Sequence, residues 1–159
     1  MSKKETKTNA MRILEKHKIP FTVQTYECEE FIDGLQTASI LGLDPNMMYK
    51  TLVTIGKTKV HYVFVIAINQ ELDMKKAAKA VKEKSLEMLP LKDLTKVTGY
   101  MRGGCTSIGM KKEFQTVIDL HAKELDNMVI SGGRIGTQLI LEPKDLCQVV
   151  RGTFVDIIK

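Results

Sequence analysis

The chain has 159 residues, of which 43% are hydrophobic and 27% are charged, and its formal net charge is +5. This length and composition predict one soluble globular domain, residues 1–159, and the basic balance permits a polyanionic partner without requiring one. The longest apolar run, residues 62–68, is far too short to span a bilayer, and the charged N-terminus does not match a secretory signal. We therefore expect a cytoplasmic protein without a membrane segment.

Helical and extended patterns follow one another without a regular strand–helix–strand repeat. In chain order, periodicity and turn residues predict a helix at 9–18, a strand at 21–27, a helix at 36–42, strands at 48–56 and 59–69, helices at 72–84 and 90–99, strands at 115–120, 127–132 and 137–142, a helix at 143–150 and a strand at 153–158. Thr8 is the expected cap of the first helix, Pro20 its stop, and Gly99 the end of the helix at 90–99. The mixture predicts an α+β domain around a mixed sheet that could close on itself.

The cysteines and histidines do not indicate a disulfide scaffold or a metal centre. The cysteines are Cys28, Cys105 and Cys147. Their odd number, long spacings and lack of a C-x-x-C pair fit a reducing compartment. The histidines are His17, His61 and His121, and they share no metal-ligand spacing with one another or with the cysteines. We expect no metal site.

Two glycine-rich stretches could approach a ligand. Gly104 to Gly109 has glycine spacing like that of a phosphate loop, but Met110 stands where such a loop needs lysine, which excludes a nucleotide triphosphatase of that type. Residues 131–136 lack the spacing of a dinucleotide site. The pairs at 103–104 and 132–133 are either turns or side-chain-free backbone that donates N–H groups to a carbonyl or phosphate. Neighbouring hydroxyl residues favour the second interpretation slightly.

Two side chains have both a structural and a chemical interpretation. Lys50 begins an apolar strand, where it is either an edge residue or a charge at the mouth of an apolar pocket, and spacing does not decide between them. Cys105 lies among glycines, with Arg102 before it and Lys111 and Lys112 after it. A nucleophilic cysteine needs a base, and no histidine is near in sequence, so packing of a small residue is the favoured interpretation.

Taken together, five segments resemble the YbaK/EbsC group of aminoacyl-tRNA deacylases, which is related to the editing domain of bacterial prolyl-tRNA synthetases. The segments are residues 7–27, 41–53, 74–89, 98–112 and 130–146. They cover nearly the whole chain in order and are most similar to the stand-alone branch that clears Cys-tRNA(Pro). The resemblance implies a mixed β-barrel-like sheet with flanking helices, an enzyme without a cofactor, and mischarged tRNA(Pro) and prolyl-tRNA synthetase as partners.

The resemblance also implies roles for individual residues. It implies catalytic roles for Lys50, Gly103 and Gly104. It implies substrate-binding roles for Tyr26, Phe31, Thr51, Ser131, Gly132, Gly133 and Gln138. Some relatives carry an acidic residue where this chain has Gln138, so the expected site lacks one candidate negative charge. In this family the substrate cysteine is thought to attack its own ester, while the protein positions it and stabilises the oxyanion. On this reading Cys105 is a packing residue.

Other functions remain open at this level. The chain could deacylate tRNA(Pro) that carries another small amino acid such as alanine, since near-isosteric side chains are hard to distinguish. It could be a tRNA- or synthetase-binding module without turnover, or a hydrolase that depends on Cys105. For tRNA itself, we expect electrostatic contacts from the basic helix at 74–84 and from Lys111 and Lys112.

Overall fold

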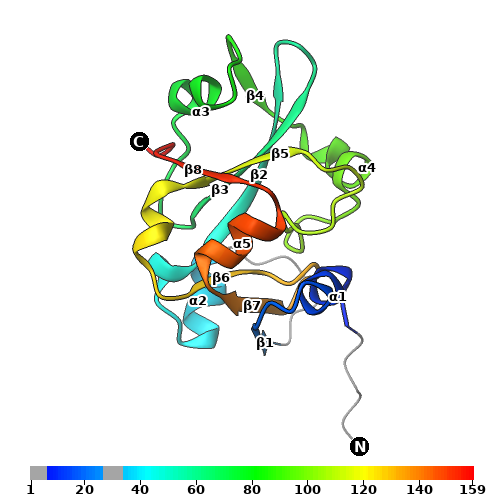
Figure 1. Ribbon diagram of the computed structural model, residues 1–159, viewed down its shortest axis with the longest axis vertical. Helices are drawn as coiled ribbons and strands as arrows, with labels where there is room; N and C mark the ends of the chain where they lie inside the picture. Colours follow the sequence, from blue (N-terminus) through cyan, green and yellow to red (C-terminus); the bar gives the residue numbers. More distant parts are fainter. Residues whose placement is uncertain (1–6, 27–33) are drawn as a thin grey trace, which may run out of the picture.

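A computed structural model describes residues 7–26 and 34–159. The α-helices are α1 (Asn9–Lys16), α2 (Gly34–Leu41), α3 (Met74–Ala80), α4 (Leu94–Thr98) and α5 (Pro143–Val149), and short 3-10 helices are η1 (Pro45–Met47), η2 (Leu91–Asp93) and η3 (Leu120–Glu124). The strands are β1 (Thr22–Thr25), β2 (Tyr49–Gly56), β3 (His61–Ala67), β4 (Leu86–Met88), β5 (Gln115–Asp119), β6 (Met128–Ser131), β7 (Thr137–Leu141) and β8 (Thr153–Val155). The β2–β3 hairpin runs along the length of the molecule (Figure 1).

Within the described residues the strands form two open sheets. One has the order β4-β2-β3-β5-β8, with antiparallel pairs from β4 to β3 and parallel pairs from β3 to β8. The other is an antiparallel sheet of order β1-β7-β6. The α+β class with flanking helices is confirmed. The expected barrel-like sheet is divided into two sheets and is not closed. Among the described residues, β6 pairs with the first sheet only at the bridge Met48–Val129, and its ladder is formed with β7.

Two apolar layers cover the faces of the longer sheet. One layer joins it to the three-stranded sheet, α1 and α5, and includes the fully buried Leu14, Leu139 and Leu146. The other packs the opposite face of β3 against α3 around Phe64 and Ala77. Burial of apolar surface in these layers is the main force that fixes both sheets in place. No helix of the described residues is long and apolar enough to cross a membrane.

Local signals fix several element ends. The Thr8 hydroxyl accepts a hydrogen bond from the Met11 N–H at 3.2 Å, so the predicted cap of α1 is confirmed. Gly99 ends α4 with a φ of 87°, in the left-handed region that favours glycine. The helix expected at 72–84 is shorter, because Asp73 caps its first turn and Lys82 turns into the left-handed region.

No pattern in the sequence predicts β4, a strand of three residues that pairs with the far end of β2. The chain reaches it after a tight turn in which Glu83 accepts a hydrogen bond from the Tyr62 hydroxyl at 2.6 Å. Because β4 stops at Met88, it pairs only with Thr54–Gly56, and among the described residues no strand forms a ladder with the first half of β2 on that edge.

Candidate functional site

A pocket of about 550 Å³ opens along this uncovered half of β2. Its walls come from α2, from the end of β4 with η2 and α4, from the loop after α4, and from the adjoining ends of β1, β6 and β7. The volume lies within the range of about 300–1,000 Å³ that is usual for small-molecule sites. Segments from across the sequence therefore meet in one concave site.

The pocket brings together most of the residues that the sequence marked for chemistry. Those that line it are Tyr26, Lys50, Thr51, Gly103, Ser131 and Gln138. Gly104, Gly132 and Gly133 belong to the same two loops but do not line it. Phe31 lies outside the described residues. Gln138 is 8% exposed and pairs in register with Gln24 on one side and Ser131 on the other, so a neutral amide lines the pocket between them.

Lys50, like Arg102, is a cation that lines this site. It pairs in register with Ile66 of β3 and so shares the face of the sheet that α3 covers, whereas Thr51 pairs with Val65 and lies on the opposite face. Both residues line the pocket because it opens on the edge of the strand. Within residues 7–26 and 34–159, the partly buried Lys50 has no hydrogen-bond or ion-pair partner. Its ammonium group is thus available to a carbonyl, carboxylate or phosphate of a ligand.

The paired glycines let two loops pack closely beside the pocket. A Cβ on Gly104 would lie 2.8 Å from the Arg134 Cα, and a Cβ on Gly132 would lie 2.6 Å from the Thr137 Cγ2. Real Cβ atoms do not approach other atoms so closely, so any side chain at Gly104 would push the loop after α4 away from the loop between β6 and β7. These glycines set the shape of the pocket wall.

Several N–H groups of the glycine loops already have acceptors in the protein. The N–H of Gly104 donates to the Met101 carbonyl at 3.0 Å, that of Gly132 to the Thr137 carbonyl at 2.8 Å, and that of Gly133 to the Ser131 hydroxyl at 3.3 Å. An anion-binding role for these three groups would therefore require the loops to rearrange. Gly103, with a φ of 85°, is the glycine of the pairs that lines the pocket.

Cys105 lines the same pocket, and its surroundings oppose ionisation. Burial raises the pKa of its thiol to about 11, and a hydrogen bond with Thr98 offsets this only in part. Lys111, one of the nearby cations in sequence, instead donates to the Lys96 carbonyl at 3.2 Å. A thiol with a raised pKa is a poor nucleophile near neutral pH, which favours the packing interpretation of Cys105.

The sequence did not point to the wall formed by β4, η2 and α4. This wall consists of Met88, Leu89, Leu91 and Leu94. Met88 is 47% exposed and Leu91 is 56% exposed, and both exposed side chains lie on the pocket wall. Leu91 and Leu94 have helical spacing, but that spacing alone would predict burial in the core. Only the tertiary structure shows that they face an open site.

A second cluster of polar groups lies at the end of β5. The donor atoms of Asp119, His121 and Asp156 are within 4.8 Å of one another. The buried Asp119 carboxylate accepts hydrogen bonds from the Ile157 N–H at 3.2 Å and from the His121 N–H at 3.3 Å, while Asp156 forms an ion pair with Lys76 at 3.1 Å. The hydrogen bond with Asp119 raises the pKa of His121. These contacts tie β5 to the C-terminal segment.

Known proteins match this chain along nearly its whole length. It is 43% identical over 160 residues to an Enterococcus faecalis protein whose assigned name, Cys-tRNA(Pro)/Cys-tRNA(Cys) deacylase EbsC, is provisional, with 99% of this chain and 98% of that protein covered. A crystal structure described provisionally as a trans-editing enzyme for prolyl tRNA synthetase has a TM-score of 0.81 at 19% identity and covers 97% of this chain and 99% of its own. The structure of hypothetical protein APE2540 has a TM-score of 0.84 at 16% identity, with 93% and 97% covered.

At such low identities the two structures show the fold alone. The family assignment rests on the sequence. Residues 33–149 match the aminoacyl-tRNA editing domain, a span that includes β2 and both glycine loops. With the similarity to EbsC, this match confirms the expected relationship and the class of enzyme. The chain belongs to the aminoacyl-tRNA editing domain family.

Proposed function

We propose that this chain is a trans-editing deacylase that hydrolyses the ester of mischarged Cys-tRNA(Pro), and that residues 1–159 act as one domain in the cytoplasm. The observation that carries the proposal is the pocket itself. It presents a lysine, Lys50, that has no partner among the described residues, and Cys105, which also lines it, has a raised pKa. Such a site positions and polarises an ester, and Cys105 supplies little thiolate to it.

The substrate provides the nucleophile in this mechanism. Its thiolate attacks its own ester carbonyl, which forms the S–C bond of a small thiolactone and breaks the C–O bond to the ribose. The thiol proton ends on the released ribose hydroxyl, and water then opens the thiolactone to cysteine. Lys50 stabilises the negative charge that develops on the carbonyl oxygen, and Gly103 lets the backbone approach that carbonyl closely. Tyr26, Thr51, Ser131 and Gln138 hold the aminoacyl group.

Gly104, Gly132 and Gly133 have a supporting role in this proposal. Gly104 lets its loop pack against Arg134 of the other loop, Gly132 packs closely against Thr137, and the Gly133 N–H holds the Ser131 hydroxyl. A proposed contact of Phe31 with the substrate rests on the resemblance to the family alone. Gln138 presents a neutral amide to the substrate, and neutral amides can both donate and accept hydrogen bonds.

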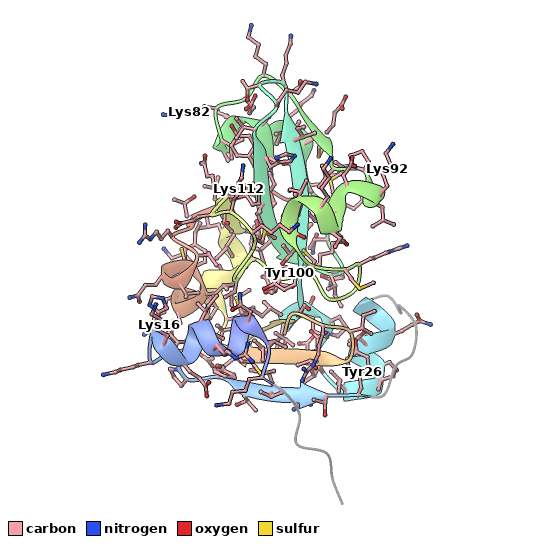
Figure 2. The ribbon with its side chains drawn as sticks, turned by 90° about the vertical axis from the view of Figure 1, so that its right-hand side faces the viewer. Lys16, Tyr26, Lys82, Lys92, Tyr100 and Lys112 are labelled. Atoms are coloured by element: carbon pink, nitrogen blue, oxygen red, sulfur yellow. The ribbon has the colours of Figure 1, made fainter. Side chains whose placement is uncertain are left out.

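Recognition of the tRNA body is proposed to be electrostatic, with prolyl-tRNA synthetase as a partner that supplies selectivity for tRNA(Pro). The basic face of α3 and the pair Lys111 and Lys112 remain the expected contacts. Figure 2 places Lys82, just beyond α3, near the top of the molecule and Tyr26 near the bottom. An RNA that contacts α3 while its end occupies the pocket must therefore extend along the molecule.

One assay tests the activity. Purified protein is incubated with Cys-tRNA(Pro), Ala-tRNA(Pro), Pro-tRNA(Pro) and Cys-tRNA(Cys), with and without prolyl-tRNA synthetase, and ester loss is followed. We expect fast loss of cysteine from tRNA(Pro) and none of proline. Preferential loss of alanine would instead make the chain an alanine deacylase. Binding of tRNA without loss of any ester would make it a binding module.

A further inference from the structure

Tyr100 lies against both glycine loops but is not among the residues that line the pocket. It begins the loop after α4, and Gly103 of that loop lines the pocket. A Cβ placed on Gly133, in the loop between β6 and β7, would lie 3.4 Å from the Tyr100 Cε1. The Tyr100 ring is therefore in contact range of the second loop. Figure 2 shows Tyr100 near the middle of the molecule, between α4 and α1.

The Tyr100 hydroxyl ties together two distant parts of its own loop. It donates a hydrogen bond to the carbonyl of Ile108, eight positions further along the chain. Ile108 is 1% exposed and belongs to the apolar layer that includes α1, so the acceptor has a fixed place. Gly103 and Cys105, which both line the pocket, lie between the two bonded residues. The hydrogen bond therefore restricts the conformations of the segment that carries them.

Further hydrogen bonds hold Tyr100 itself. The Asn9 amide, at the start of α1, bonds to the Tyr100 hydroxyl and donates to the Gly109 carbonyl at 3.4 Å. The Thr98 hydroxyl accepts the Tyr100 N–H at 3.0 Å and donates to the Leu94 carbonyl at 2.8 Å. Burial raises the pKa of Tyr100 to about 12, so its hydroxyl keeps its proton and its role as a donor near neutral pH.

The place of Gly103 matters to the reaction because the ester carbonyl must be held where negative charge develops. A displacement of about 1 Å in such a site can cost on the order of 100-fold in rate. We propose, on the basis of the proposed function, that Tyr100 is a positioning residue for deacylation, whose hydroxyl keeps the loop with Gly103 fixed against the loop that follows Ser131. Tyr100 acts through this loop and does not touch the substrate.

A positioning role predicts a loss in kcat with little change in KM. Stabilisation of the oxyanion acts in the transition state, so a displaced Gly103 lowers kcat. Lys50 of β2 and Tyr26 after β1 lie on other elements, so they continue to bind the ground state. Tyr100→Phe removes only the hydroxyl and leaves the ring beside Gly133. We expect its kcat on Cys-tRNA(Pro) to fall about tenfold and its KM to stay within about twofold of wild type.

Tyr62→Phe is the matched control. The Tyr62 hydroxyl also donates a hydrogen bond, to Glu83 at 2.6 Å, and Tyr62 is not among the residues that line the pocket. Each variant loses one hydrogen-bonded tyrosine hydroxyl, and thermal unfolding measures the stability that each loses. Only Tyr100→Phe should lose kcat. An equal fall in kcat in both variants, a wild-type kcat in Tyr100→Phe, or a loss carried by KM instead of kcat would overturn the proposal.

Alkylation of Cys105 provides a readout that does not depend on turnover. Iodoacetamide reacts with the thiolate, and mass spectrometry of the peptide that contains Cys105 gives the rate. Burial keeps this thiol protonated in the wild type. A loosened loop admits water to the thiol, so Tyr100→Phe should be alkylated about tenfold faster than wild type, whereas Tyr62→Phe should match wild type.

The two readouts separate failure of this proposal from failure of the proposed function. An unchanged alkylation rate of Cys105 in Tyr100→Phe would overturn the positioning role while leaving the deacylase intact. Failure of the wild type to release cysteine from tRNA(Pro) would refute the proposed function. The alkylation rates would then still decide whether the Tyr100 hydroxyl fixes the loop.

Discussion

Replacing Cys105 by alanine separates the two thiols that could attack the ester. Burial raises the pKa of Cys105 to about 11, so roughly one molecule in 3,000 has a Cys105 thiolate at pH 7.5. A free cysteine side chain has a pKa of about 8.5, so about a tenth of it is ionised at the same pH. The substrate thiol is thus favoured by a factor of about 300 in thiolate population. We therefore expect Cys105→Ala to retain activity within about threefold of wild type, the loss reflecting altered packing in the pocket wall.

Single-turnover deacylation rates show directly which of the two thiols attacks the ester. Cys-tRNA(Pro) and Ser-tRNA(Pro) are each mixed with excess wild-type protein or excess Cys105→Ala protein, and circular dichroism checks that the variant is folded. Serine is nearly isosteric with cysteine, so fit alone separates the two esters by little, yet its hydroxyl is almost never ionised near neutral pH. The cysteine ester should react more than about 100-fold faster with both proteins. Loss of activity in folded Cys105→Ala, or equal rates on the two esters, would refute the substrate-thiol mechanism.

Three further predictions follow from the site and the charges. Lys50→Ala should fold normally and lose at least about 100-fold in deacylation rate, because it removes the charge that stabilises the oxyanion. The control Lys57→Ala, in the exposed β2–β3 turn, should keep the wild-type rate. A wild-type rate in folded Lys50→Ala would exclude the role assigned to Lys50. Affinity for tRNA should fall about tenfold or more between 50 and 200 mM salt, as counterion release by the α3 lysines requires, and an affinity independent of salt would exclude them. The raised pKa of His121 stabilises the folded protein below pH about 6.5, and this stabilisation is lost as pH rises through the folded-state pKa. The free energy of unfolding of wild type relative to His121→Asn should therefore decrease from pH 6 to pH 8, and a pH-independent difference would contradict it.

Signals between neighbours in the chain determined much of this protein. The cap by Thr8, the end of α4 at Gly99 and the β2–β3 hairpin each depend on residues within a few positions, so the sequence predicts them directly. The same holds for the relationship to the editing family, because the matching segments stand in order along the chain. The resemblance to this family also marked Lys50 as a candidate catalytic residue, although the spacing of Lys50 alone left its role undecided.

Contacts between distant segments decided the rest. Whether the strands form one closed sheet or two separate sheets depends on how many residues of β6 pair along the edge of β2. Among the described residues this pairing is limited to the bridge between Met48 and Val129. The apolar wall of the pocket exists because β4 is too short to cover β2, and no periodicity marks a strand of three residues. Ionisation of Cys105 depends on burial, which the sequence does not contain. Cations stand near Cys105 in the sequence, but the loops packed around it remove water from the thiol and keep it protonated, in agreement with the packing interpretation.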